Sequence, residues 1–311
     1  MIEKRTDLAI EIRESFPDDD VEIDGVILKE KYFDKKRIRV STVVIKNEHG
    51  AIRMGKPIGR YVTIEMCGDD IILSEEEKAE QLHKIIKLIG DTLYDMEKNI
   101  AGKKNEIKLN EFMVTGLGNR FATPDALGPA VMERIDVNRH LLLEFGDEVI
   151  SDNKKSVCGI APGVMSQTGI ETSEILNGLV RDVKPDCLIV IDALASRSIS
   201  RLCRTIQITD TGISPGAGIG NNRNKVNEDT MNVPVIAIGV PTVVDAGTIV
   251  RECMEETLFE QGFDENEIYL FLNSIAENKY SNLFVTPKDI DEKIGWIAGC
   301  VADGMNYFFS I

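Results

Sequence analysis

From about residue 108 onward, short apolar runs alternate with segments of helical pattern. The runs are EFMVTGLG (111–118), HLLLEF (140–145), CLIVIDA (187–193), RTIQITD (204–210) and VPVIAIG (233–239), and helices are expected near Pro124, from about Thr172 and from about Ala246. Runs this apolar are typical of strands that are buried on both sides, as in a parallel sheet covered by helices. The alternation therefore predicts an α/β fold with a mostly parallel central sheet flanked by helices.

The N-terminal part of the chain has a different pattern. Three β-type runs, over 21–28, 37–45 and 60–66, are separated by turn residues. Residues 74–102 then predict a long amphipathic helix, because Ser74 and Glu77 form a capping box ahead of apolar residues at helical spacing. Thr286 and Pro287 are typical of the start of a further helix. We expect a β-rich portion that ends at residue 73, an α/β core over 74–263 and a C-terminal helical segment over 264–311.

The charge balance and the cysteines limit the class of protein. The chain has 311 residues, with 52 acidic against 36 basic side chains and a formal net charge of −16, which disfavours direct binding to nucleic acid or to an anionic membrane. Its six cysteines are far apart and form no C-x-x-C pair. Neither a secretory signal nor a membrane-spanning apolar stretch is evident, so we expect a protein of the reducing cytoplasm.

Four aspartates lie at or just beyond the ends of strand-like runs, where ligands gather in sheets of this kind. They are Asp125, Asp192, Asp210 and Asp245. Asp210 belongs to an Asp-Thr-Gly triplet, but the proteases with that motif need two copies on all-β folds, and one copy is present here. Two neighbouring aspartates that share a proton can activate water and protonate an amide. Alternatively, Asp125 merely stabilises the first turn of a helix. Position alone leaves both interpretations open.

Other chemistries have weaker support in the sequence. The chain has three histidines, His49, His83 and His140, and contains neither G-x-S-x-G nor H-E-x-x-H. The glycine-rich loop at 213–224 is followed by NKVNEDT in place of a helix that would bind phosphate, so it indicates a loop near substrate more than a nucleotide site. Paired carboxylates are therefore the favoured chemistry.

Several long blocks resemble the germination protease family of spore-forming bacteria, atypical aspartic endopeptidases. They include TPDALGP (123–129), PDCLIVIDALASRS (185–198), TIQITDTGISPGAGIGNNR (205–223) and VPVIAIGVPTVVDA (233–246), with further similarity in RTDLAIE (5–11) and GKPIGRYVTIE (55–65). The resemblance implies an α/β fold like that of hydrogenase-maturation proteases, assembly as a homotetramer, and a zymogen that removes its own N-terminal segment. It also implies substrates, the small acid-soluble proteins that coat spore DNA, and hence a location in the cytoplasm of the forespore or spore core.

The resemblance assigns residues as well. It places the two essential aspartates at Asp125 and Asp192 and the self-cleaved bond between Asp7 and Leu8, so that residues 1–7 are a prosegment and 8–311 one protease domain, with 8–73 as its β-rich portion. Without the resemblance, RTDLAIE reads as a first strand. Candidate anchors for the acidic side chain of a substrate are Arg197, Arg201 and Arg223.

We expect no metal and no other cofactor. Backbone N–H groups of 116–119 and 159–163 are candidate donors to an oxyanion. Two alternatives are a metal-dependent maturation-type protease and a non-catalytic nucleotide-binding α/β protein.

Overall fold

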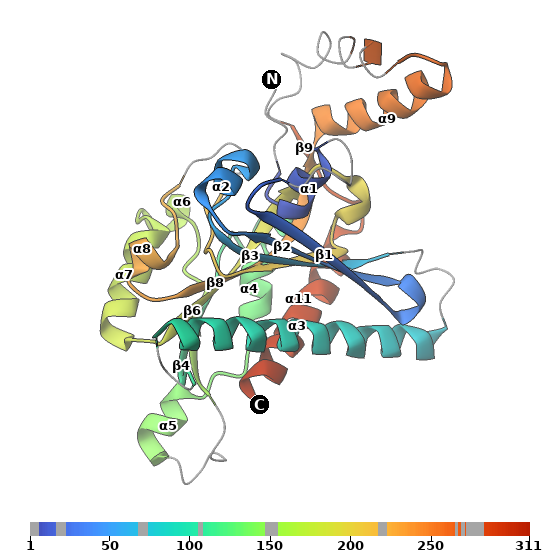
Figure 1. The fold of residues 1–311 in the computed structure, drawn as a ribbon. Coiled ribbons are helices and arrows are strands. Elements are labelled where there is room, and N and C mark those ends of the chain that lie inside the picture. The colour runs from blue at the N-terminus through green and yellow to red at the C-terminus, as the bar shows by residue number, and fades with distance from the viewer. Residues whose placement is uncertain are drawn as a thin grey trace.

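The computed structural model describes residues 6–16, 23–67, 74–104, 108–146, 155–216, 223–264, 267–268, 271 and 283–311. The strands in these ranges form one nine-stranded sheet flanked by helices (Figure 1), in the order β1-β2-β3-β7-β8-β6-β4-β5, with β9 paired to β8. The strands are β1 Val26–Phe33, β2 Ile38–Ile45, β3 Gly59–Met66, β4 Glu111–Gly116, β5 Ser156–Ile160, β6 Cys187–Ser196, β7 Thr205–Thr209, β8 Val235–Asp245 and β9 Phe284–Val285. The expected α/β architecture is confirmed.

The sheet is mixed, where the sequence predicted a mostly parallel one. Strands β5, β4, β6 and β8 are parallel to one another, but β7 runs antiparallel to β8 and to β3, which continues antiparallel into β2 and β1. The β-rich N-terminal portion therefore supplies three of the nine strands of the same sheet. Buried apolar runs indicate that a strand is covered on both faces, but they do not give its direction.

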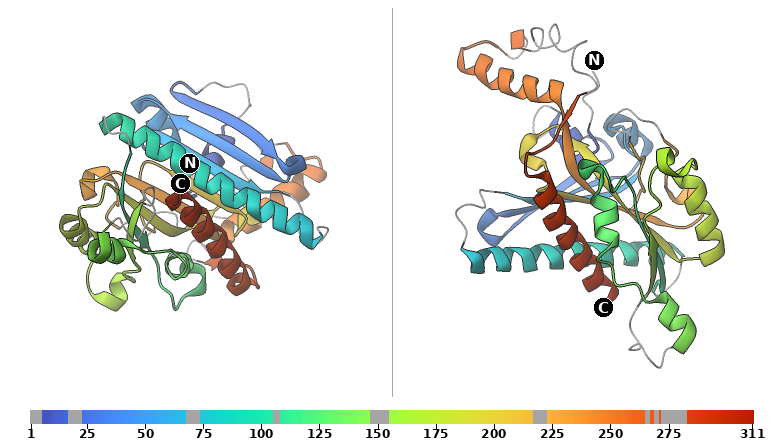
Figure 2. Two further views of the ribbon diagram at one scale, coloured as in Figure 1. Left: turned by 90° about the horizontal axis from the view of Figure 1, so that it is seen from below. Right: turned by 180° about the vertical axis from the view of Figure 1, so that it is seen from behind.

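One face of the sheet packs against α3 (Glu75–Lys104), α4 (Leu127–Met132) and α11 (Ile290–Phe309). In Figure 2, α3 and α11 lie across this face at an angle to each other. Isoleucines of the central strands meet both helices in the largest hydrophobic core, among them Ile189, Ile208 and Ile238, none of them exposed. The expected long helix is confirmed.

The opposite face carries two smaller hydrophobic clusters. One joins α1 (Ala9–Glu14) and α2 (Glu48–Met54) to the N-terminal strands and to Leu194 of β6. The other joins α7 (Thr172–Val183) and α8 (Glu228–Met231) to β4, β6 and β8, with Val190 of β6 at its centre. Asp192 lies between these two residues of β6 and, by the two-residue period of a strand, faces the same side. The gap between the clusters is where the candidate site forms.

Some local predictions were wrong. HLLLEF is not a strand, but forms α5 (Arg139–Phe145), on which Leu143 is 69% exposed. RTDLAIE is not a first strand either, because α1 begins at Ala9. The C-terminal helix begins at Ile290, and the hydroxyl of Thr286 donates instead to the Thr242 carbonyl (2.9 Å). Much of the segment at 264–282, and residues 217–222 of the glycine-rich loop, lie outside the described residues.

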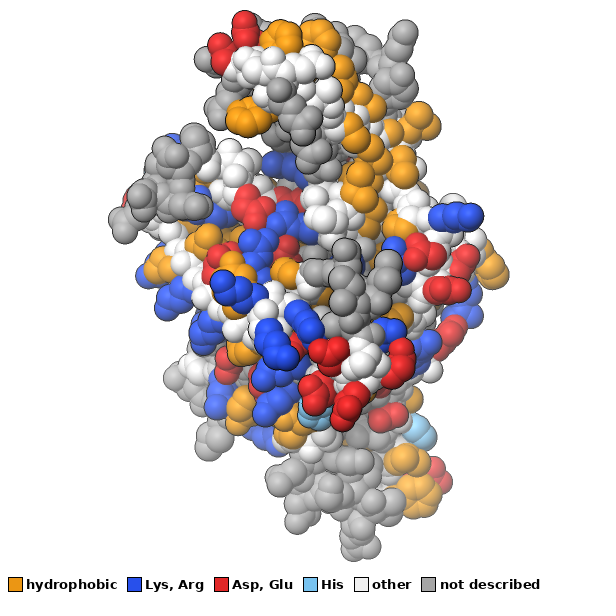
Figure 3. Space-filling view, turned by 90° about the vertical axis from the view of Figure 1, so that its right-hand side faces the viewer, with side chains coloured by type: hydrophobic (Ala, Val, Ile, Leu, Met, Phe, Trp, Pro, Cys, Tyr) orange, Lys and Arg blue, Asp and Glu red, His pale blue; other side chains and the backbone are white. Residues whose placement is uncertain are grey.

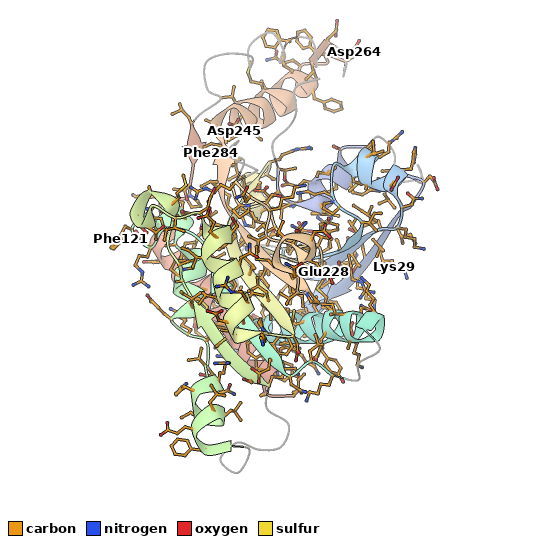
Figure 4. All side chains as sticks on the ribbon, turned by 90° about the vertical axis from the view of Figure 1, so that its left-hand side faces the viewer. Lys29, Phe121, Glu228, Asp245, Asp264 and Phe284 are labelled. Carbon is orange, nitrogen blue, oxygen red and sulfur yellow. The ribbon has the colours of Figure 1, made fainter. Side chains whose placement is uncertain are left out.

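An arm projects from the body at the end of β8. It consists of α9 (Ala246–Glu260) and β9, and Figure 4 shows Asp245 and Phe284 at its base, where the two residues pair across β8 and β9. Hydrophobic side chains gather along this arm (Figure 3). Phe259 of α9 and Val285 of β9 are exposed. In the described part of the chain, no helix is both long and apolar enough to cross a membrane.

Candidate active site

Two of the four strand-end aspartates, Asp245 and Asp210, accept hydrogen bonds from backbone N–H groups that fix nearby elements. Asp245 is the N-cap of α9, since its Oδ1 accepts from the Thr248 N–H (3.1 Å). Asp210 accepts from the Arg60 N–H at 2.8 Å and so joins the loop after β7 to the start of β3. These contacts give both residues a structural role.

Asp192 is held inside the sheet. Its side chain is 6% exposed, and its Oδ1 accepts from the N–H of Ala193 (2.9 Å). Gly239 of β8 lies directly opposite Asp192, and its missing side chain makes room for Leu194, whose Cδ1 would lie 2.4 Å from a Cβ there. A buried carboxyl in such a position is expensive to ionise.

Asp125 approaches from the loop after β4. It ends the 3₁₀ turn η3 (Thr123–Asp125), and its Oδ2 accepts from the Asn119 N–H at 2.9 Å. Gly118 has φ +110°, and a Cβ there would lie 2.0 Å from the Asp125 carbonyl oxygen. Only glycine therefore allows this loop to fold back on itself. The Thr242 hydroxyl fixes the turn from β8 by donating to the Pro124 carbonyl (2.6 Å).

The two carboxyls line one cavity of about 290 Å³ together with Asp7 and Arg223. Burial raises the pKa of Asp192 well above its ordinary value, and the carboxylates of Asp125 and Asp7 raise it further. Burial also raises the pKa of Asp125, and for both carboxyls a backbone N–H and the charge of Arg223 oppose the rise. The larger rise belongs to Asp192, so of the two carboxyls Asp192 holds its proton more readily, the kind of difference that acid–base chemistry needs.

The N-terminal segment enters this cavity beside β6. The N–H of Asp7 donates to the carbonyl of Ala195 (3.0 Å), and Asp7 Oδ2 accepts from the Ala195 N–H (2.9 Å). Leu8 is completely buried in the cluster under α1. Asp7, on one side of the bond expected to be cleaved, thus lines the same cavity as the two aspartates, and Leu8, on the other side, is hidden from solvent.

Lys56 and Gln207 were not singled out from the sequence. Both donate to the Asp7 carbonyl oxygen, from Lys56 Nζ at 3.0 Å and from Gln207 Nε2 at 3.2 Å. Each lies inside a block that carries the family resemblance, but neither has a motif that indicates contact with residue 7. Only the fold brings them there.

The three candidate anchor arginines are not together. Arg223 lines the cavity, whereas Arg201 pairs with Glu11 (3.2 Å), Glu14 (2.8 Å) and Glu65 (2.7 Å). The Arg197 N–H donates to Glu11 Oε2 at 2.8 Å. Arg197 and Arg201 thus fix α1 to the sheet, and a substrate role for either stays a prediction.

The described ranges contain no group of three or more His, Cys, Asp or Glu side chains placed to hold a metal ion. His49 approaches Asp24 at the surface (3.6 Å), His83 lies in α3 and His140 in α5. None of the three lines the cavity that contains Asp125 and Asp192.

Comparisons with known proteins agree with the resemblance. A model of the germination protease family matches residues 2–277. The germination protease of Clostridium perfringens is 41% identical over 322 residues, covering 98% of this chain and 95% of that protein. Those of Caldanaerobacter subterraneus subsp. tengcongensis and Bacillus velezensis are 43% and 36% identical, over 97% of this chain and 93% and 92% of theirs. A solved NiFe hydrogenase maturation protease, HycI from Thermococcus kodakarensis, is 16% identical, with a TM-score of 0.31 over 63% of this chain and 93% of its own. By its family match and these relatives, the chain belongs to the germination protease family.

Proposed function

We propose that this peptidase is an aspartic endopeptidase made as a zymogen, and that Asp125 and Asp192 hydrolyse its own Asp7–Leu8 bond. The observation that carries the proposal is one cavity lined by Asp125, Asp192 and the residue on the acyl side of that bond. After the removal of residues 1–7, the same pair acts on the small acid-soluble proteins of the spore and so initiates their degradation in germination.

The electrostatics suggest a role for each carboxyl. Asp125, whose ionised form the Asn119 N–H and Arg223 support, takes a proton from the attacking water. Asp192, whose burial favours the neutral form, protonates the departing nitrogen. Water is the nucleophile, so no covalent acyl-enzyme forms.

The prosegment would inhibit the enzyme by occupying the substrate site. Asp7 fills the place of an acidic substrate residue, with its carboxylate on the Ala195 N–H and the cation of Arg223 on the same cavity wall. Loss of residues 1–7 would free this place for the acidic residue that precedes the bond cut in a substrate. Leu8 indicates a preference for a large apolar residue after it.

The same proposal includes the assembly and the location of the enzyme. Exposed apolar side chains on α9, β9 and α5, among them Phe259, Val285 and Leu143, are suited to contacts between copies in a homotetramer. The enzyme would act in the cytoplasm of the forespore and spore core, where its substrates are, without itself binding DNA or membrane.

Incubation of the purified protein at mildly acidic pH tests the cut, with intact mass as the readout. We expect the loss of seven residues, at a first-order rate that does not depend on protein concentration, because the bond already lies in its own site. A chelator should not change the rate. Inhibition by chelator would favour a metal-dependent protease instead, and stabilisation by a nucleotide without any cleavage would favour a binding protein.

A further inference from the structure

The carbonyl group of Asp7 lies between two cavities. On one side is the cavity with Asp125 and Asp192, and on the other is a cavity of about 310 Å³ lined by Lys56, Gln207 and Tyr61; Asp7 and Leu194 line both. We infer that Lys56 and Gln207 form the oxyanion site of this protease and stabilise the negative charge that develops on the Asp7 oxygen. The inference rests on the proposed cut at Asp7–Leu8.

Lys56 follows the C-terminal end of α2, which directs its side chain toward this carbonyl. Gly55 closes the helix in the left-handed conformation (φ +59°), and its successor Lys56 then turns inward, with its N–H on the Ala51 carbonyl (3.2 Å). Its Nζ lies 3.0 Å from the Asp7 oxygen. A cation at this distance stabilises an oxyanion more strongly than it stabilises a neutral carbonyl.

Gln207 reaches the same oxygen from the sheet. In β7 it lies opposite Gly239, which lies opposite Asp192 in β6, so that the three form one row on one face. Gly239 has no side chain, and the Leu194 side chain fills the space beside it, because a Cβ there would lie 2.4 Å from Leu194 Cδ1. Gln207 Nε2 donates to the Asp7 oxygen at 3.2 Å, while Oε1 accepts from the Ala9 N–H at 2.7 Å.

The Gln207 carboxamide thus holds the backbone on both sides of the bond to be cut. Because it contacts only main-chain atoms, it would hold any peptide in this register, whatever its side chains. Since Asp192 and Gln207 are fixed in one row of the sheet, the acid and the donor keep a constant separation. This geometry replaces the N–H groups of 116–119 and 159–163 that the sequence offered as oxyanion donors.

The chemistry balances with water as the only co-reactant. Water adds to the Asp7 carbonyl carbon and gives a proton to Asp125, and the carbonyl electrons move to the oxygen held by Lys56 and Gln207. The carbon–nitrogen bond then breaks, with the proton of Asp192 going to the Leu8 nitrogen and the carbonyl re-forming. The products are the α-carboxyl group of Asp7, which ionises by returning a proton to Asp192, and the Leu8 amine, which takes the proton held by Asp125.

The charge on Lys56 depends on its burial and on Asp7. Burial lowers the pKa of Lys56, and the Asp7 carboxylate opposes that shift. An oxyanion partner has to be protonated, and a lower pH favours the protonated amine.

The test is the first-order rate of self-cleavage in the full chain, followed by intact mass. Lys56→Met keeps the length of the side chain without the charge, and Gln207→Glu keeps the acceptor for Ala9 but loses the donor to Asp7. Each should slow cleavage by about 100-fold or more, the usual effect of removing one oxyanion donor. Lys56→Arg should recover part of the rate, and Lys46→Met, an exposed lysine before α2, should cleave like the wild type.

The urea midpoints of unfolding show whether each variant is folded, and the two independent variants keep the test valid if one is not. Cleavage of folded Lys56→Met and Gln207→Glu at the wild-type rate, with Asp192→Asn inactive, would overturn the oxyanion site and leave the aspartate pair standing. A wild-type chain that keeps residues 1–7, or an Asp192→Asn variant that loses them normally, would overturn the proposed function and the inference together.

Discussion

Asp192→Asn should abolish self-cleavage and make the protein more stable at neutral pH. The asparagine keeps the Oδ1 acceptor for the Ala193 N–H and nearly the same volume. It removes a group that is 6% exposed and that faces the carboxylates of Asp125 and Asp7. The loss of the proton donor should slow cleavage by about 10² to 10⁴-fold.

The gain in stability follows from the raised pKa of Asp192. The folded protein keeps a proton that the unfolded chain releases above about pH 3.9, so the wild type loses stability as pH rises from there to the folded-state pKa. Each pH unit in that window costs about 1.4 kcal/mol. Asp192→Asn should therefore be about as stable as the wild type near pH 4 and exceed it by about 1.4 kcal/mol more for each pH unit up to the folded-state pKa of Asp192.

Urea unfolding of both proteins between pH 4 and pH 7 measures this difference, with intact mass to verify that residues 1–7 are still present. Asp125→Asn is the control: its gain should be smaller, because the pKa of Asp125 is raised less than that of the more deeply buried Asp192. A difference for Asp192→Asn that stays constant across the pH range, or a net loss of stability at pH 7, would refute the electrostatic reasoning.

Three further changes test the surroundings of the site. Arg201→Met removes the cation that Glu11 and Glu65 share, both of them buried, and should lower the free energy of unfolding in urea by about 3–5 kcal/mol. Arg181→Met is the control: it breaks only the exposed pair with Asp182 and should lower the same free energy by at most about 1 kcal/mol. Gly118→Ala should lower the free energy of unfolding by about 1–3 kcal/mol through backbone strain and slow self-cleavage by displacing Asp125. A Cβ at Gly102 of α3 would meet nothing within 4 Å, so Gly102→Ala should raise the free energy of unfolding by up to about 1 kcal/mol in the same assay. An added endoprotease specific for acidic residues should spare the Asp7–Leu8 bond of the folded Asp192→Asn variant and cut it in urea, since Leu8 is fully buried; cleavage of the folded variant would contradict this.

The elements of the fold were largely predictable because most have strong local signals. The long helix has its capping box, and the central strands are apolar runs such as CLIVIDA. The direction of β7 was not predictable, since its partners β3 and β8 are distant in sequence and an antiparallel strand buried on both faces has the same composition as a parallel one. The helix α5 was missed because a six-residue apolar run fits either structure.

The residues of the candidate site, like the elements of the fold, were only partly predictable from the sequence. The four strand-end aspartates were visible in the sequence, and all four accept from backbone N–H groups. Only the fold separates Asp125 and Asp192, which line one cavity, from Asp210 and Asp245, which do not line it. No local sequence pattern indicates a site role for Lys56 or Gln207, because their partner is the backbone carbonyl of Asp7, which is 49 residues from Lys56 and 200 residues from Gln207. Such contacts depend on topology, which local patterns do not encode.

The most direct test of the central claim is the intact mass of four proteins after incubation under one condition: the wild type, Asp125→Asn, Asp192→Asn and Asp210→Asn. Asp210→Asn is the matched control, since asparagine can still accept from the Arg60 N–H. We predict that the wild type and Asp210→Asn lose residues 1–7, and that the other two variants stay at full length with a wild-type circular dichroism spectrum. Normal loss of residues 1–7 from Asp125→Asn or Asp192→Asn would contradict the account.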